Sequence, residues 1–369
     1  MRLLYVSSDV SAIHLNLLNA LEKNDIHSTL CTYTTSSNSK EPLQTNETWF
    51  YRSNNPFRGP ILYLYRLLQV AKFYLQKTES TKINVTHGNM LFGDGFICRY
   101  LYKHASIPYV VSVRNTDMNL WFLWKLPWIR QAGIKNLEQS KRIVFLSNPY
   151  KRMLLNRLPE TIRTQIESKC VVVPNGIDDF WFENREKRTR SIQSEIVFIT
   201  AGRVEDNKNQ LTTALAINLY RKKHNIPVRY LIVGDCENME MQNALKTFDF
   251  VELLPYQKKE ELIYSLRRSD IYIMPSHTET FGLVYAEALT QGLPVIYTSG
   301  QGFDEQFAEG EVGYAVDSRS KESICKGIEQ TVANYDEISK NAYCLCERFR
   351  WQTVSSNLKE IYNATLGNS

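Results

Sequence analysis

The chain has 369 residues, 43% of them apolar, and a formal net charge of +5 at pH 7. This length and composition allow a substantial buried core in two domains and argue against intrinsic disorder. No uncharged apolar run approaches the roughly 18 residues that a membrane-spanning helix needs, and Met1 to Asp9 predict a first β-strand instead of a signal peptide. We therefore expect a cytoplasmic protein.

Strand-like and helix-like runs alternate in the first half of the chain. The Ser/Thr-rich stretch from Ser28 to Ser39 is expected to be a loop. The alternation predicts a parallel sheet covered on both faces by helices. Strands are predicted at 3–6, 109–113, 143–146 and 171–173, and helices at 14–21, 62–76 and 150–158.

A charged, apolar-poor stretch from Glu183 to Glu195 is the best candidate for a linker, and a second alternation follows it. We therefore expect an α/β protein with two tandem Rossmann-like domains, residues 1–180 and 181–350, that face a ligand-binding cleft. The predicted strands of the second domain are 196–200, 229–233, 271–274 and 295–297, and its helices are 210–222, 259–267, 281–291 and 321–333.

Charge is distributed unevenly between these two parts. Residues 1–180 contain 22 Lys or Arg against 13 Asp or Glu, a net +9, which leaves −4 for the rest of the chain. Such a basic unit suits an anionic partner, for example a membrane surface or a pyrophosphate-bearing acceptor. A solvated face that only keeps the protein soluble explains the charge equally well.

The seven cysteines are scattered, and Cys344 and Cys346 form the only close pair. Reduced thiols without a role in metal binding or redox chemistry are therefore favoured.

Arg203 and Lys208 follow the predicted strand 196–200. Cations at the carboxyl end of a strand can hold a diphosphate, Arg203 in a bidentate manner and Lys208 as a point charge. Taken alone, the pair is more often found as ordinary surface residues.

Glu279 and Glu287 stand eight residues apart on either side of a predicted strand-to-helix turn. One carboxylate could orient the hydroxyls of a hexose and the other those of a ribose. Gly282 would allow a close backbone approach at this turn, where the free N–H groups of the helix favour an anion. The alternative is that Glu279 only favours the helix N-terminus and Glu287 is solvated.

The segment Pro275-Ser276-x-x-Glu279-x-Phe281-Gly282-Leu283-x-x-x-Glu287-Ala288-x-x-x-Gly292-x-Pro294-Val295 resembles the E-x7-E signature of the family 4 glycosyltransferases, retaining enzymes of the GT-B fold. The resemblance extends from about residue 172 to the end of the chain and is looser in the N-terminal domain. It implies that residues 351–369 form a helix that crosses back to the N-terminal domain. Its further motifs lie at 172–178, 202–203, 208, 232–235, 269–270, 349 and 351, and more loosely at 86–95 and 107–111.

The resemblance also implies roles for individual residues. Arg203 and Lys208 would hold the donor diphosphate, Glu279 would bind the donor sugar, and Glu287 would bind the ribose. The chain has no Asp-x-Asp triplet, which fits the metal independence of the family, so no metal and no cofactor beyond the nucleotide sugar are expected. The remaining donor-binding candidates are Phe281, Gly282, Leu283 and Asn175.

The N-terminal domain departs from the family pattern at two places. The loop after the first strand has no glycine, so its contacts to acceptor or phosphate are not assumed. Where many relatives have a histidine after the strand 109–113, this chain has Arg114-Asn115-Thr116-Asp117. Arg114 could contact the donor sugar, or it could pair with Asp117 and only shape the loop.

His87 and Asp94 are further acceptor-side candidates. A histidine after a strand can act as an acid–base group or contact an acceptor hydroxyl, although it is more often a satisfied structural residue.

Two aromatic and basic segments, residues 57–77 and 119–135, could lie on an anionic bilayer or pack in the core of the N-terminal domain.

We interpret the chain as a retaining, metal-independent glycosyltransferase that moves a sugar from a nucleotide-diphosphate donor to a glycan or lipid-linked acceptor in surface polysaccharide assembly. It would act in the cytoplasm or on the inner face of the cell membrane, and no nucleic-acid partner is expected. Two alternatives remain open: a sugar-nucleotide epimerase of the same fold, and a catalytically silent nucleotide-sugar-binding subunit. The sequence does not identify the base, the sugar or the acceptor.

Overall fold

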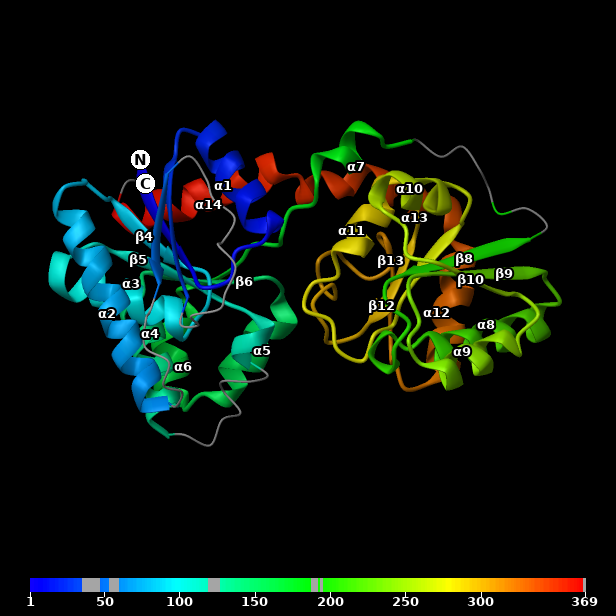
Figure 1. The fold of residues 1–369 in the computed structure, drawn as a ribbon. Coiled ribbons are helices and arrows are strands. Elements are labelled where there is room, and N and C mark those ends of the chain that lie inside the picture. The colour runs from blue at the N-terminus through cyan, green and yellow to red at the C-terminus, as the bar shows by residue number, and fades with distance from the viewer. Residues whose placement is uncertain (35–46, 53–59, 119–126, 187–191, 193–194, 368–369) are drawn as a thin grey trace. The chain divides into compact units, whose positions relative to one another are not determined.

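The computed structural model describes residues 1–34, 47–52, 60–118, 127–186, 192 and 195–367, and its chain divides into two compact units (Figure 1). The chain passes from the N-terminal unit, unit 1, to unit 2 after Gly176, and it returns to unit 1 at Trp351. Residues Glu183 to Glu186 of the expected linker belong to unit 2, while 187–191 and 193–194 lie outside the described residues. Unit 1 comprises Met1–Leu146, Tyr150–Gly176 and Trp351–Ser369, and unit 2 comprises Ser147–Pro149 and Ile177–Arg350.

Unit 1 contains a seven-stranded parallel sheet in the order β3-β2-β1-β4-β5-β6-β7. Its strands are β1 (Arg2–Ser7), β2 (His27–Thr34), β3 (Thr48–Arg52), β4 (Val85–Gly88), β5 (Tyr109–Val113), β6 (Arg142–Phe145) and β7 (Cys170–Val172). Its helices are α1 (Ala12–Lys23), α2 (Pro60–Glu79), α3 (Gly93–Ala105), α4 (Pro127–Gln139), α5 (Asn148–Arg157), α6 (Glu160–Glu167) and α14 (Trp351–Leu366).

The central strand β1 of unit 1 is buried and apolar on both faces, as expected for a parallel sheet covered by helices. Leu4 and Val6 pack with the cluster that includes residues of α2 and α3, whereas Leu3 and Tyr5 pack with the cluster that includes residues of α1 and α14. The last helix therefore lies on the N-terminal domain, which confirms the expectation from the resemblance.

The expected loop from Ser28 to Ser39 is wrong over its first half, because His27–Thr34 form the strand β2 beside β1. Its hydroxyl residues are buried with their apolar neighbours; Thr29 and Thr32 are 0% and 2% exposed. β-Branched threonine suits a buried strand, so Ser/Thr content alone was a misleading signal of a loop. Residues 35–39 lie outside the described part of the chain.

Unit 2 contains a six-stranded parallel sheet in the order β10-β9-β8-β11-β12-β13. Its strands are β8 (Ile196–Ala201), β9 (Val228–Val233), β10 (Val251–Leu254), β11 (Ile271–Ile273), β12 (Val295–Thr298) and β13 (Gly313–Val316). Its helices are α7 (Asp179–Glu183), α8 (Gln210–His224), α9 (Met239–Lys246), α10 (Lys259–Arg267), α11 (Leu283–Thr290), α12 (Lys321–Ala333) and α13 (Tyr335–Leu345), with 3₁₀ turns η2 (Asp206–Lys208) and η3 (Cys346–Phe349).

Helix α2 covers most of the first aromatic segment and packs one face into the core of unit 1. Leu67, Val70 and Tyr74 are buried, whereas Tyr65 on the same helix is 53% exposed. The described part of the second segment begins with α4, where Trp128 is 49% exposed; residues 119–126 lie outside the described residues. Among the described residues, no helix combines the length and the apolar character needed to span a bilayer.

Candidate functional site in the second domain

The candidate donor residues of unit 2 gather where the order of its sheet reverses. Strands β8 and β11 are neighbours, although β9 and β10 come between them in the chain. Ligands of open α/β sheets bind beyond the carboxyl ends of the strands at such a switch point. Lys208 follows β8 and Glu279 follows β11, so the topology brings the two loops to one edge of the sheet.

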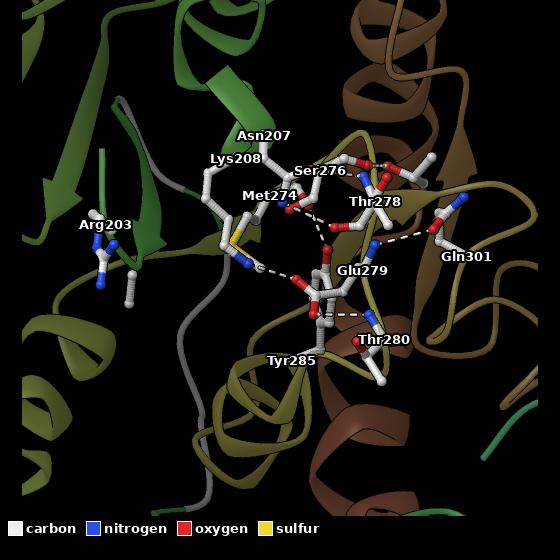
Figure 2. A network of polar contacts seen from close by, with 12 residues as sticks. Arg203, Asn207, Lys208, Met274, Ser276, Thr278, Glu279, Thr280, Tyr285 and Gln301 are labelled. Carbon is white, nitrogen blue, oxygen red and sulfur yellow. Dashed lines mark hydrogen bonds and ion pairs between the residues drawn. The ribbon is translucent and has the colours of Figure 1, made fainter. Parts of the chain in front are cut away.

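Lys208 and Glu279 form an ion pair at this edge. The Nζ atom of Lys208 lies 2.7 Å from Oε2 of Glu279, and the two side chains are only 21% and 14% exposed. Figure 2 shows the two side chains pointing toward one another from opposite loops. A partly buried pair is less screened by water than a surface pair, and removal of one partner leaves a charge that is poorly solvated.

The loop that carries Glu279 is fixed by contacts from both sides. Oε1 of Glu279 accepts a hydrogen bond from the backbone N–H of Thr280 (3.1 Å), and the backbone N–H of Glu279 donates to Oε1 of Gln301 (3.0 Å). A Cβ atom on Gly302 would lie 1.9 Å from the carbonyl oxygen of Thr280. Only glycine therefore allows the loop after β12 to approach the Glu279 loop this closely.

A cavity of about 330 Å³ lies at the same edge, within the size range of small-ligand pockets. The side chain of Arg203 is exposed at this cavity, and Figure 2 shows it apart from the Lys208–Glu279 pair. A Cβ atom on Gly234 would lie 2.1 Å from the carbonyl oxygen of Gly202, so a glycine is required where the loops after β8 and β9 meet. The lining residues end or follow β8 and β9, follow β10, or belong to α10 and α11; they are Ala201, Gly202, Arg203, Val233, Gly234, Asp235, Tyr256, Gln257, Leu262 and Val284.

Glu287 lies on α11, one turn after Val284 of the cavity wall. Burial raises the pKa of Glu287 to about 7. A hydrogen bond with the Trp181 side chain and the charge of Lys259 act in the opposite direction, while the charge of Asp178 adds to the increase. The carboxyl group of Glu287 therefore gains or loses its proton near neutral pH.

Phe281, Gly282 and Leu283 offer backbone groups at the start of α11. Gly282 has a φ of +76°, which favours glycine, and Leu283 is the first residue of the helix. The Phe281 side chain is 2% exposed and its ring centroid lies 5.6 Å from that of Phe349. Phe281 can therefore reach a ligand only through its main chain.

In unit 1, Arg114 and Asn175 lie close together. Nη1 of Arg114 is 3.4 Å from Oδ1 of Asn175, and Nη2 donates to Oδ1 of Asn89 (2.9 Å). Asp117 is fully buried and its Oδ2 accepts hydrogen bonds from the backbone N–H groups of Arg114 (2.9 Å) and Leu91 (3.1 Å). Burial raises the pKa of Asp117 to about 6. The buried carboxylate of Asp117 thus shapes the loop after β5 through these main-chain contacts.

His87 lies within β4 and is 2% exposed. Its Nδ1 is 2.7 Å from the hydroxyl of Tyr362 and its Nε2 is 2.9 Å from that of Ser112. Burial and the charge of Arg114 lower the pKa of His87 to about 3. Both ring nitrogens of His87 are engaged inside the core, which favours the interpretation of His87 as a satisfied structural residue over a contact to an acceptor hydroxyl.

Asp94 is fully buried in the first turn of α3, and its contacts are likewise those of a structural residue. Oδ1 accepts hydrogen bonds from the hydroxyl of Tyr33 (2.9 Å) and the backbone N–H of Ser8 (3.2 Å), and Oδ2 from the backbone N–H of Met90 (3.0 Å). Burial raises the pKa of Asp94 to about 7. Its carboxyl group anchors the loop after β1.

Two amide residues at the edge of unit 2 were not found from the sequence. Asn207 precedes Lys208 and holds the loop of Glu279, and Gln301 holds the same loop from the β12 side. The only sign of their role in the sequence is that each follows the end of a predicted strand. Within the part of the chain that the structure describes, no three His, Cys, Asp or Glu side chains form a group suited to a metal ion.

The chain is similar to known proteins in both sequence and structure. A 23% identical relative, the α-monoglucosyldiacylglycerol synthase of Acholeplasma laidlawii, aligns over 325 residues, 81% of this chain and 79% of that protein. The structure of the lipopolysaccharide outer core galactosyltransferase WaaB superimposes with a TM-score of 0.75 at 13% identity, covering 99% of each chain. The crystal structure of Anabaena HepE in complex with UDP gives a TM-score of 0.70 at 14% identity, covering 99% of this chain and 100% of that chain.

Both halves of the chain match family models. The first, described as Glycosyltransferase Family 4, matches residues 11–179, and the second, described as Glycosyl transferases group 1, matches residues 182–344. The structural neighbours share the fold of two parallel α/β domains, GT-B. The chain therefore belongs to the family 4 glycosyltransferases.

Proposed function

We propose that the protein transfers a sugar, with retention of configuration and without a metal ion, from a nucleotide-diphosphate sugar to a glycan or lipid-linked acceptor. The observation that carries the proposal is the Lys208–Glu279 pair at the switch point of unit 2. Arg203 at the adjacent cavity supports it. Preorganised cations at a developing diphosphate charge are the largest available contribution to catalysis in such a reaction.

Each donor residue has a place in this proposal. The nucleoside would occupy the cavity beside Arg203, with its ribose at Glu287 and its diphosphate at Arg203 and Lys208. The sugar would lie at Glu279. The complexes of Anabaena HepE with UDP and with UDP-glucose make uridine donors the first to test.

Surface polysaccharide or glycolipid assembly is the setting we propose. WaaB acts on lipopolysaccharide outer core and the Acholeplasma relative is a glucosyldiacylglycerol synthase, according to their names. An anionic membrane is a suitable partner for residues 1–180, whose net charge is +9. Exposed Tyr65 and Trp128 supply aromatic side chains of the type found at a bilayer interface. Flotation with anionic liposomes should fall as salt rises, and should fall further when both residues are replaced by alanine.

The experiment that tests the activity is a panel of nucleotide sugars. A ligand at 100 times its dissociation constant adds about 2.7 kcal/mol to the free energy of unfolding, so a matching donor should raise the melting temperature. Transfer to acceptors should then proceed in the presence of a chelator, and NMR of the product should show an α-anomer from an α-linked donor.

The same experiments distinguish a transferase from a silent binding subunit and from an epimerase. Tight nucleotide binding without turnover on any acceptor would indicate a silent subunit, and proton exchange at the sugar without an acceptor would indicate an epimerase.

A further inference from the structure

Asn207 is joined to the Glu279 loop by three hydrogen bonds. Its side-chain Nδ2 donates to the carbonyl oxygen of Thr278 (3.0 Å), and its Oδ1 accepts from the backbone N–H of Thr278 (3.0 Å). Its own carbonyl oxygen accepts from the backbone N–H of His277 (2.8 Å). The amide of Asn207 thus pairs with both main-chain groups of Thr278, in the way that a neighbouring strand would.

The neighbours of these two residues form the ion pair. Lys208 follows Asn207, and Glu279 follows Thr278, so two consecutive residues on one loop bind two consecutive residues on the other. Figure 2 shows the two contacts next to each other. A shift of the Glu279 loop away from η2 would therefore have to break the bonds of Asn207 before it could separate Glu279 from Lys208.

We propose that Asn207 is a positioning residue, which fixes the Glu279 carboxylate relative to Lys208 and so relative to the donor sugar. This inference rests on the proposed function. The contacts of the Asn207 side chain are to main-chain groups of the Glu279 loop, so it acts through that loop and need not touch the substrate. Gln301 supports the loop from its other side by accepting a hydrogen bond from the backbone N–H of Glu279.

The variant Asn207→Ala removes the two side-chain bonds. Misplacement of a sugar-binding group by about 1 Å can cost up to about 100-fold in rate, so we expect a large decrease in kcat. The cavity that would hold the nucleoside is lined by other residues. The affinity for UDP should therefore change less than about twofold, while that for UDP-glucose should fall about tenfold, as for the loss of one charge-assisted hydrogen bond.

A matched control lies in the same loop. Thr278→Ala keeps the main-chain groups that Asn207 binds, so its kcat and its ratio of UDP-glucose to UDP affinity should equal those of the wild type. A second variant, Gln301→Ala, should lower the same ratio from the opposite side. Melting temperatures show that each variant is folded.

A double-mutant cycle separates positioning from a general structural effect. In a Glu279→Ala background, Asn207→Ala should leave the affinity ratio of UDP-glucose to UDP unchanged, because the group that it positions is gone. Two results would overturn the inference. One is an Asn207→Ala protein whose kcat and whose ratio of UDP-glucose to UDP affinity equal those of the wild type. The other is a loss of UDP-glucose affinity on Asn207→Ala substitution that is as large in the Glu279→Ala background as in the wild type. If the wild-type protein binds none of the UDP, GDP or ADP sugars, the proposed function fails and the inference fails with it; donor binding with an unaffected Asn207 variant overturns the inference alone.

Discussion

Lys208 and Glu279 are 71 residues apart in the chain, yet the Nζ atom of the lysine lies 2.7 Å from Oε2 of the glutamate. The reversal of strand order between β8 and β11 produces this proximity. Each side chain compensates the charge of the other in a partly buried setting. The effects on stability of replacing Lys208 and of replacing Glu279 are therefore not expected to add.

Replacement of Glu279 by alanine should reduce glycosyl transfer at least about 100-fold, since a sugar-binding group would be lost at the reacting centre. Nucleotide binding should largely survive, because the cavity residues are unchanged. Turnover assays and calorimetry with the same donor measure the two effects. Glu260, exposed on α10, gives a matched control, and a Glu279→Ala enzyme as active as Glu260→Ala would remove Glu279 from the site.

Replacement of Lys208 by alanine should weaken the binding of a nucleoside diphosphate by about 10-fold to 100-fold, which corresponds to the 1.5–3 kcal/mol of a charge-assisted hydrogen bond. The variant also leaves the Glu279 carboxylate partly buried without its cation, so its melting temperature should fall. Calorimetry with the diphosphate and thermal unfolding measure these changes. The control Lys246→Ala, on the exposed face of α9, should change neither the affinity for the diphosphate nor the melting temperature. If the Lys208→Ala and Lys246→Ala proteins bind the diphosphate equally well, the role of Lys208 is contradicted.

Glu287 should make the free energy of unfolding dependent on pH. Burial raises its pKa in the folded protein from 4.5 to about 7, so between these values the folded state retains a proton that the unfolded state has lost. The cost of ionising this side chain therefore reduces stability as pH rises from about 4.5 to 7, by on the order of 2–3 kcal/mol at 1.36 kcal/mol per pKa unit. Glu287→Gln removes this cost.

Denaturant unfolding at several pH values measures this effect. The stability of the Glu287→Gln protein relative to the wild type should increase between pH 5 and pH 8. A difference that does not change over this range would show that Glu287 ionises normally in the folded protein.

Trp351 should be important for the stability of unit 1. The residue is 5% exposed, and a Cβ atom on Gly176 would lie 2.4 Å from its indole ring. Trp351→Ala should cost about 3–5 kcal/mol, the usual range for a buried tryptophan. Trp128→Ala, at a position that is 49% exposed, should cost far less. Chemical denaturation compares the two, and similar losses would mean that the Trp351 contact is not maintained in solution.

The elements that the sequence predicted well are those with a clear apolar period. Helices α10 and α12 have the predicted bounds, and β8 differs by one residue, because continuous apolar strands and amphipathic helices carry their own signals. Strand β2 was missed because its Ser and Thr residues look like a loop, although pairing with β1 buries them. Strand β10 (Val251–Leu254) was also missed, because its four residues are too few to show a periodic apolar pattern.

For the candidate site, the charged residues were accessible to sequence reasoning but their surroundings were not. Lys208 and Glu279 follow strands, and the topology of an open α/β sheet brings such positions together. His87 and Asp94 also lie close to a strand end, yet both face the core, and only the packing of Tyr362 and Tyr33 against them reveals this. Asn207 binds main-chain groups, which leave no pattern in a sequence.

Helix α14 belongs to unit 1 but follows unit 2 in the chain, so unit 1 cannot be completed until the end of the chain has been synthesised. All seven strands of unit 1 are synthesised before residue 177, but the helix that packs beside α1 follows the whole of unit 2 (Figure 1). Until Trp351 to Leu366 emerge, apolar groups such as Leu17 and Tyr5 lack part of their cover. Nascent chains released before this point would expose that surface, which makes truncated products susceptible to aggregation and proteolysis.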